Sequence, residues 1–234
     1  MDVVGQLRSS GPIHFDHRLR VCNAYPYSSA INVYRGADLL TEAMPYKTCQ
    51  DLKSALVAGD KLDFKIGSAS AGVFSVSDLP NNDAVLLLII HRHDGLSSAA
   101  AFESHVFANL LNSQVAVFDT YSGSALSTPE IVDERGGKSR SETLRFNSVV
   151  AVNKGMYEVK LKDHTGVTKA VSELVALNHE SYVVIRTGVE AHSGQSYPED
   201  LIVFPQSSTA QLSGAQEVMS SAAWLVLFLA LFAH

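Results

Sequence analysis

Two copies of one strand pattern constrain the fold of this chain more than any other feature of its sequence. The tetrapeptide Val76-Ser77-Asp78-Leu79 recurs as Val171-Ser172-Glu173-Leu174. Three further matches keep the same order, at offsets of 96, 95 and 97 residues: 21–25 with 117–121, 62–66 with 157–161, and 85–88 with 182–185. Four ordered matches at nearly constant spacing indicate an internal duplication. We therefore predict two units of similar size, residues 18–111 and 112–206.

Within each unit, short runs rich in Val, Ile, Phe and Tyr are separated by turn residues. Lys61–Ile66 alternates strictly between polar and apolar residues, as a half-buried strand does. Residues 84–90 are continuously apolar, which is typical of a central strand covered on both faces. The pattern predicts an all-β chain of two tandem antiparallel sandwiches. It also predicts one helix over 98–111, where apolar residues recur every fourth position, with a strand pair as the alternative.

Composition and charge exclude several classes of protein. The chain has 234 residues, of which 46% are hydrophobic, so it can bury a substantial core. Its 18 basic and 24 acidic side chains give a net charge of −6, which argues against binding of nucleic acid. Two cysteines are too few for a disulfide-dense scaffold or a four-thiolate zinc site.

The start of the first unit resembles a known family. The segment Arg20-Val21-Cys22-Asn23-Ala24-Tyr25-Pro26, followed by Ala30-Ile31-Asn32-Val33-Tyr34, is similar to the opening of domain-of-unknown-function family 4397. The resemblance implies tandem immunoglobulin-like sandwiches on exported or surface-anchored proteins, and it implies no catalytic residue. Asn32 stands where the family usually has Asp, and the second unit lacks the proline of the motif.

The opening motif also has a direct physical interpretation. Pro26 has no backbone N–H and a restricted φ, so we expect it to end the first strand in a bend. The side chains of Asn23 and Asn32 are suited to bonding backbone groups of nearby turns. These residues therefore predict a structural role for the motif.

One cluster of residues suggests a metal site. His91 and His93 are two positions apart at the end of the apolar run, so they would lie on one face of a strand, and Asp94 could add an oxygen ligand. A metal-binding protein or metal-dependent enzyme using these three residues is therefore an alternative function. The other interpretation is a strand that leaves the core with polar residues at its exposed end.

The two cysteines, Cys22 and Cys49, are 27 residues apart. In an oxidising compartment they could form a disulfide within the first unit, worth on the order of 3 kcal/mol by the loop-entropy model. In the cytosol each would be a small buried apolar side chain.

No pattern for catalysis or cofactor binding stands out. Gly136-Gly137-Lys138-Ser139 looks like the end of a phosphate-binding loop, but it lacks the earlier glycine and follows two acidic residues, so a hairpin turn is expected. We therefore predict that the chain is not an enzyme and requires no cofactor.

The C-terminal segment differs from the rest of the chain. Residues 222–233 are apolar without interruption, after a polar spacer at 207–221. Even a helix over 218–233 would measure roughly 24 Å, shorter than the ~30 Å hydrocarbon core of a membrane. A removable lipid-anchor signal fits better, with attachment at Ser208 or Ser213.

Residues 1–17 are expected to be a flexible leader without a recognisable signal peptide. Either the true start lies upstream and the protein reaches the cell surface, which the resemblance favours, or a retained hydrophobic tail helix anchors a cytosolic body. The sequence thus predicts a non-catalytic, membrane-anchored interaction or structural module. Its partner could be a protein or a glycan, and a further alternative is an accessory subunit of a membrane complex.

Overall fold

The computed structural model describes residues 15–53, 55–108, 111–133 and 139–213, and nearly all of its regular structure is β-strand. The first unit contains β1 (His17–Ala24), β2 (Asn32–Arg35), β3 (Asp38–Leu39), β4 (Thr48–Lys53), β5 (Lys61–Ile66), β6 (Ala69–Ser75), β7 (Ala84–Arg92) and β8 (Ala100–Ala108). The second contains β9 (Ser113–Asp119), β10 (Ser127–Asp133), β11 (Arg140–Thr143), β12 (Ser148–Val152), β13 (Gly155–Asp163), β14 (Thr168–Ala176), β15 (Ser181–Val189) and β16 (Tyr197–Phe204). A short 3-10 helix, η2 (Thr209–Ser213), follows.

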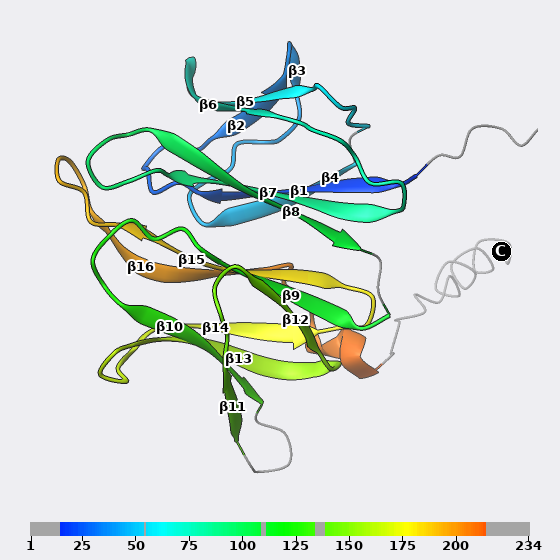
Figure 1. Ribbon diagram of the computed structural model, residues 1–234, viewed down its shortest axis with the longest axis vertical. Coiled ribbons are helices and arrows are strands. Elements are labelled where there is room, and N and C mark those ends of the chain that lie inside the picture. The colour runs from blue at the N-terminus through cyan, green and yellow to red at the C-terminus, as the bar shows by residue number, and fades with distance from the viewer. Residues whose placement is uncertain (1–14, 54, 109–110, 134–138, 214–234) are drawn as a thin grey trace, which may run out of the picture.

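Each unit is a β-sandwich, and the two sandwiches have the same topology. The first pairs a sheet of order β4-β1-β7-β8 with one of order β3-β2-β5-β6. The second repeats both orders eight strands later, as β12-β9-β15-β16 and β11-β10-β13-β14. Figure 1 shows the four sheets as four successive layers along the long axis of the molecule. The predicted all-β fold with two tandem sandwiches is therefore confirmed.

The pairing of the strands is antiparallel except at one place in each sandwich. β1 pairs with β7 in parallel, and β9 pairs with β15 in parallel. The chain leaves the sheet after β1 and comes back to it beside β1 by a long crossover, which is the kind of connection that parallel neighbours require. The prediction that all strand pairs are antiparallel was therefore wrong for these two pairs.

The strands correct two details of the sequence repeat. Val171-Ser172-Glu173-Leu174 lies within β14, whereas Val76-Ser77-Asp78-Leu79 follows the end of β6, so the two tetrapeptides do not occupy equivalent positions. Val21 lies opposite Leu88 in the first sandwich, and Val117 lies opposite Val184 in the second, so both partners are displaced by 96 residues. The offset of 97 taken from sequence matched Val85 with Tyr182 and is wrong by one position. A shift of one residue moves a side chain to the other face of a strand.

The helix expected over 98–111 is also wrong. The segment forms β8, which pairs with β7 along its whole length, from Ala84 opposite Ala108 to Arg92 opposite Ala100. Residues four apart share a face in a strand as well as in a helix, so Phe102 and Val106 satisfy both patterns. The long-range pairing with β7 decided between them.

The opening motif has the structural role expected of it. β1 ends at Ala24, two residues before Pro26. Asn23 bonds both sides of the bend: its Nδ2 donates to the carbonyl of Met44 at 2.8 Å, and its Oδ1 accepts the N–H of Tyr25 at 3.0 Å. Asp119 accepts the N–H of Tyr121 in the same way, at 3.1 Å, 96 residues later. Asn32, by contrast, lies inside β2 and not in a turn.

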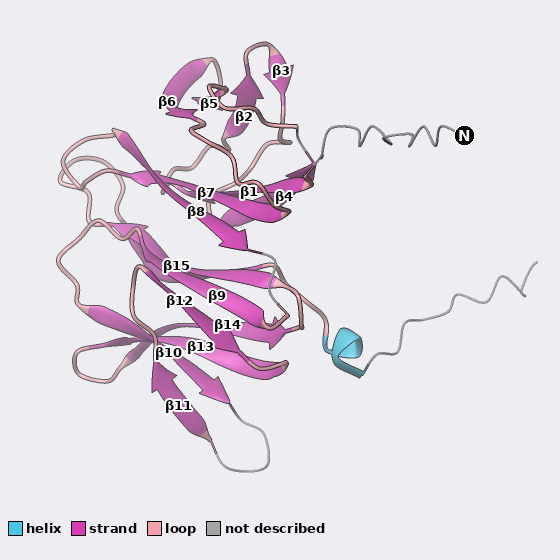
Figure 2. Cartoon of the chain, turned by 45° about the vertical axis from the view of Figure 1, so that its right-hand side comes forward, coloured by secondary structure: helices cyan, strands magenta, loops and turns pink. Residues whose placement is uncertain are grey.

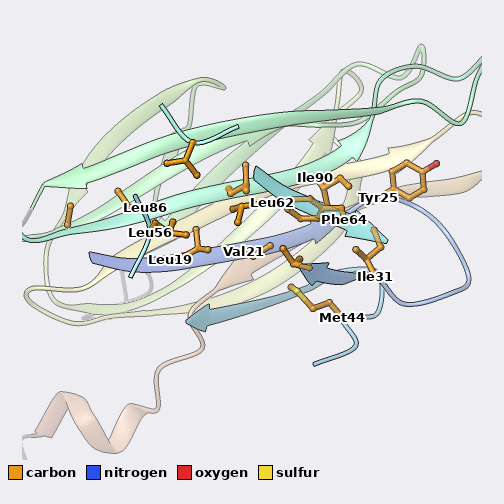
Figure 3. Close-up of a cluster of buried hydrophobic side chains, with 14 residues drawn as sticks. Leu19, Val21, Tyr25, Ile31, Met44, Leu56, Leu62, Phe64, Leu86 and Ile90 are labelled. Carbon is orange, nitrogen blue, oxygen red and sulfur yellow. The ribbon is translucent and has the colours of Figure 1, made fainter. Parts of the chain in front are cut away.

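Each sandwich encloses its own apolar core. The first core contains buried side chains from both of its sheets, of which Figure 3 labels Leu19, Val21, Tyr25, Ile31, Met44, Leu56, Leu62, Phe64, Leu86 and Ile90. The second core contains Val115, Val117, Ile131, Leu144, Val159, Leu161, Leu174, Ala176, Tyr182, Val184, Leu201 and Val203. The alternating strands place one apolar row into each core, as the sequence pattern predicts.

Candidate functional site: the seam between the sandwiches

A third apolar cluster lies between the two sandwiches, and we call this contact the seam. It joins the outer faces of the β1- and β9-containing sheets, which lie next to each other in Figure 2. Its buried members are Cys22, Ala24, Leu87, Ile89, Phe107, Ala116, Phe118, Val183, Ile185 and Ile202. The seam explains why β7 and β15 are apolar on both faces: one face enters a sandwich core and the other enters the seam.

A fully buried arginine crosses the seam from β1. Arg20 has an exposed fraction of 0%, and its guanidinium contacts both oxygens of Asp51 on the neighbouring strand β4. It also donates to the carbonyl of Ser181 and, at 3.3 Å, to Glu180 Oε1 in the second sandwich. The ring of Phe204 lies 5.0 Å from Arg20 Cζ. Arg20 therefore ties the two sandwiches together with charge-assisted bonds.

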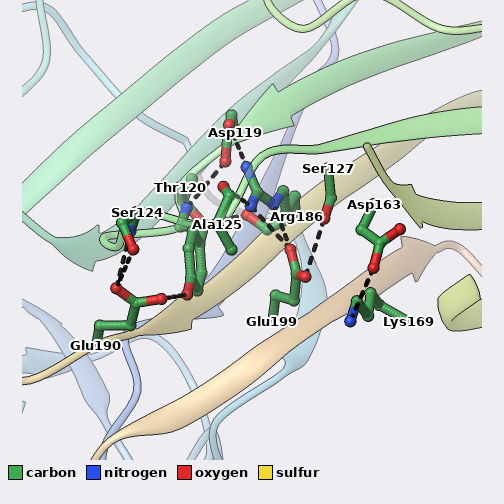
Figure 4. A network of polar contacts seen from close by, with 11 residues as sticks. Asp119, Thr120, Ser124, Ala125, Ser127, Asp163, Lys169, Arg186, Glu190 and Glu199 are labelled. Atoms are coloured by element: carbon green, nitrogen blue, oxygen red, sulfur yellow. Dashed lines mark hydrogen bonds and ion pairs between the residues drawn. The ribbon is translucent and has the colours of Figure 1, made fainter. Parts of the chain in front are cut away.

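A second arginine organises one end of the second sandwich (Figure 4). Arg186 is only 4% exposed; it bonds Glu199 Oε2 at 2.8 Å, Asp119 Oδ2 at 3.0 Å and the carbonyl of Ala125 at 2.6 Å. The ring of Tyr121 lies 4.4 Å from its Cζ. Each part of the guanidinium has a protein partner, so this cluster is a structural ion-pair network.

Tyr121 extends this network to the loop after β15. Its hydroxyl donates to Glu190 Oε1 at 2.7 Å, and Glu190 Oε2 accepts the backbone N–H and the hydroxyl of Ser124, both at 2.9 Å. Burial, followed by the contact with Glu190, raises the pKa of Tyr121. The bond from the backbone N–H of Ser124 is the largest of the effects that lower the pKa of Glu190.

Polar bonds also cross the seam at its edges. Tyr46 OH donates to Thr187 Oγ1 at 3.3 Å, and Thr187 Oγ1 donates to the carbonyl of Ala24 at 2.9 Å. Burial raises the pKa of Tyr46 to about 12, so its phenol remains a donor at neutral pH. Lys47 forms an ion pair with Asp200 at 2.5 Å. The two sandwiches are therefore held together by an apolar centre and a polar rim.

The predicted metal ligands lie beside the seam, but they do not converge. The side chain of His91 is 12% exposed and follows Leu87 and Ile89 on the seam face of β7, whereas that of His93 is 66% exposed. His91 Nδ1 donates to the carbonyl of Arg92, and its buried Nε2 has no hydrogen-bond partner among the described residues. Glu103 Oε1 is the nearby carboxylate oxygen, at 3.8 Å.

Asp94 organises a loop. One of its carboxylate oxygens accepts the backbone N–H groups of Leu96 and Ser97, at 2.8 and 2.7 Å, and the other accepts His93 Nδ1 at 2.9 Å. The bond from His93, followed by those from Ser97 and Leu96, holds the pKa of Asp94 well below its usual range. Within the described part of the chain, no three His, Cys, Asp or Glu side chains gather as a metal site would require.

Cys22 and Cys49 are joined by a disulfide in the structure. They lie directly opposite each other in β1 and β4, with their Cα atoms 4.1 Å apart. Both belong to the seam cluster, so the bond stabilises the sheet that the second sandwich packs against.

The predicted anchor lies mostly outside the described residues. Ser208 is exposed and its backbone N–H donates to Gln211 Oε1 at 2.8 Å, and Ser213 ends η2. The apolar tail at 222–233 and the expected hairpin at Gly136-Gly137 fall in segments that the structure does not describe. In the part of the chain that it does describe, no helix has the length and apolarity needed to cross a membrane.

Among the cavities formed by the described residues, two contrast in their chemistry. One, of about 210 Å³, opens where the seam meets solvent and has polar walls that include Asp16, Arg18, Asp83, Gln114 and His179. The other, of about 280 Å³, is an apolar opening in the first sandwich, lined on one side by Leu86, Leu88 and Val106 and on the other by Phe74 and Val76. The polar cavity draws on both sandwiches, whereas the apolar cavity belongs to the first alone.

The sequence analysis did not identify the two arginines that organise the seam and the ion-pair network of the second sandwich. Arg20 stands between Leu19 and Val21, and Arg186 ends an apolar run, so each is a charge inside a buried strand. That placement is a usable signal, because a buried charge requires partners. Their partners Asp51 and Glu199 lie on neighbouring strands and carry no local sequence signal.

Comparison with known proteins does not place the chain in a family. No protein-family model matches the sequence, and no curated protein matches it. Among solved structures, the CBM26-family module CBMbc of Eubacterium rectale Amy13K, in complex with maltoheptaose, is 9% identical over 82% of this chain and 99% of that chain, with a TM-score of 0.28. A streptococcal virulence factor described as binding α-glucan is 12% identical over 78% of this chain and 97% of that chain, with a TM-score of 0.22. TM-scores this low carry no argument about fold or function.

Proposed function

We propose that the chain is a non-catalytic interaction or structural module that its C-terminal tail holds at a membrane. The observation that carries this proposal is the seam. The second sandwich is held against the first by an apolar centre and by hydrogen bonds donated from each sandwich to the other, such as those of Arg20 and Thr187. Such a block holds the loops at its surface at fixed positions, which is what a display or spacer module needs.

The charged clusters fit the same role. Arg20, Arg186 and Asp94 bond to protein groups that keep strands and loops in place. Pairs of this kind are satisfied internally and hold no group poised for proton transfer. The cavity at the seam, with carboxylates and an arginine in its wall, suits a polar group of a protein or glycan partner.

The disulfide and the tail support a location at the cell surface. Structural disulfides persist in oxidising compartments, and Cys22–Cys49 is part of the seam. The tail supplies 12 consecutive apolar residues after a polar spacer. The resemblance of the opening motif to family 4397 points in the same direction.

Deletion of residues 207–234 tests the anchoring. We expect the deleted protein to move from the membrane fraction to the soluble fraction of cells that make it, while a deletion of residues 1–14 leaves the distribution unchanged. Unaltered membrane association after deletion of 207–234 would reject the proposal. Thiol alkylation of the intact cells distinguishes a surface body with an oxidised cysteine pair from a cytosolic body with free thiols.

A further inference from the structure

The apolar cavity of the first sandwich is the least explained feature of the fold. It lies between the two sheets, at the edge where β6 and the residues after it face β8. Val106 contributes to its wall and is still 48% exposed, although the even-numbered positions of β8 face the core. The cavity is therefore an opening in the core itself.

The second sandwich shows why the first is open. The offset of 96 between β7 and β15 makes Tyr182 the counterpart of Leu86. Ser104 lies opposite Leu88 and Val203 lies opposite Val184, so Val203 is the counterpart of Ser104. Tyr182 is fully buried, and Val203 is 5% exposed in the closed second core. The smaller Leu86 and Ser104 leave unfilled the volume that their counterparts occupy.

We propose that the C-terminal tail occupies this cavity through Trp224 while the protein is away from a membrane. The cavity is lined mainly by apolar side chains, with Asp78 and His105 also in its wall, and residues 222–233 carry no charge that a docked segment would have to bury. Trp224 is the single tryptophan of the chain and a large apolar side chain that requires cover in water. This inference rests on the proposed anchoring function in the form in which the tail is retained and not removed as a lipid-anchor signal, because it gives that tail a resting place before membrane contact.

The tail is long enough to reach the cavity. Both views show η2 on the side of the molecule where β1 begins, and Leu19 near that end lines the cavity. The second core, beside which η2 lies, and the first core are separated by two sheet spacings, or about 20 Å. Eleven residues lead from Ser213 to Trp224 and span up to about 36 Å when extended.

Docking of one side chain and insertion into a membrane compete for the same segment. The cavity covers a single aromatic ring, whereas a lipid phase covers all of residues 222–233, so contact with a membrane withdraws the tail from the protein. The docked state is therefore a soluble form that a membrane converts into the anchored form.

A contact-quenching experiment on the full chain tests this proposal. Ser77→Cys places one free thiol at the mouth of the cavity, because both native cysteines are paired. A bimane label there is quenched strongly by a tryptophan that touches it. We expect Trp224→Phe to brighten the label several-fold in dilute, vesicle-free solution, independently of protein concentration.

A matched label and a filling variant complete the design. Ser172→Cys carries the same label on β14 of the closed second sandwich, away from the cavity, and Trp224→Phe should leave its brightness unchanged. Ser104→Val, which copies Val203, should brighten the Ser77→Cys label as much as Trp224→Phe does; Leu86→Tyr replaces it if Ser104→Val fails to fold.

The outcomes separate docking from anchoring. The docking proposal is overturned if Trp224→Phe leaves the brightness of the Ser77→Cys label unchanged. It is also overturned if Trp224→Phe brightens both labels equally. Quenching that phosphatidylcholine vesicles fail to relieve would keep docking and contradict the membrane role of the tail. Vesicle binding without quenching would keep the anchor and reject docking.

Discussion

Arg20 Nε and Nη2 lie 2.7 and 2.8 Å from the two carboxylate oxygens of Asp51, so a guanidinium with no exposed surface makes a two-point contact with its direct cross-strand partner. The same guanidinium reaches the backbone of Ser181 in the other sandwich. One ion pair thus stabilises both a sheet and the contact between two sandwiches.

Removal of the carboxylate should therefore be costly. We expect Asp51→Asn to lower the free energy of unfolding by about 2 kcal/mol, because it leaves the buried charge of Arg20 with weaker partners. This value takes into account that the side chain of Asp51 is itself 25% exposed. Urea unfolding measures the change. Asp38→Asn, which removes a 3.9 Å pair with 73% of the Asp38 side chain exposed, is the matched control and should shift the midpoint little.

The disulfide should stabilise the fold through the unfolded state. Replacement of both cysteines, Cys22→Ala with Cys49→Ala, is expected to lower the free energy of unfolding by about 3 kcal/mol, because a loop of 27 residues is no longer closed. Thermal and urea unfolding of the double variant give the value. Addition of a reductant should lower the midpoint of the natural protein towards that of the double variant and leave the variant unchanged; a natural protein insensitive to reductant would contradict this account.

His91 should make stability depend on pH. Burial is the largest cause of its lowered pKa; the bond to the Arg92 carbonyl, Glu103 and Asp119 raise the pKa in part, and His93 lowers it further. Below the ordinary value of about 6.5 the unfolded chain binds a proton that the folded ring resists, so stability falls as pH decreases through that value towards the folded pKa.

The measurement compares urea midpoints of the natural protein and of His91→Gln between pH 7.5 and pH 5. His105, whose pKa burial also lowers, remains in both proteins and cancels in the difference. We expect a smaller loss of stability on acidification in His91→Gln. An equal loss in both proteins would show that His91 does not titrate in this range.

Gly95 permits a close approach of two loops across the seam. A Cβ atom at this position would overlap the carbonyl oxygen of Glu190, and the Gly95 carbonyl accepts the N–H of His192 at 2.8 Å. Gly95→Ala should therefore separate the loops and cost about 1–3 kcal/mol, a range typical of overpacking. Ser98→Ala in the same loop serves as the control. Unfolding midpoints and the amide exchange of His192 report the two effects.

Much of the fold could be read from the residues. Lys61–Ile66 becomes β5 with its predicted faces, since strict alternation specifies a strand and its buried side. The helix expected over 98–111 failed for the opposite reason: even spacing of Phe102 and Val106 is compatible with both structures, and only pairing with β7 distinguishes them.

The site was harder to predict. His91 and His93 are neighbours in sequence, yet one is buried at the seam and the other is exposed, because the strand ends between them. The sequence allowed Cys22 and Cys49 to form a disulfide or to remain two separate thiols. Only the register of β1 against β4 places them opposite each other.

The sequence by itself determined that this chain is a duplicated set of strands with an apolar tail, because periodicity and repetition are local properties of the residues. The tertiary structure decided which face of each central strand enters a core and which enters the seam. It also decided that Arg20 finds Asp51 and Ser181, and that Leu86 and Ser104 leave a cavity where Tyr182 and Val203 close one. These relationships join residues distant in the chain, and their free energies arise only when the sheets are stacked.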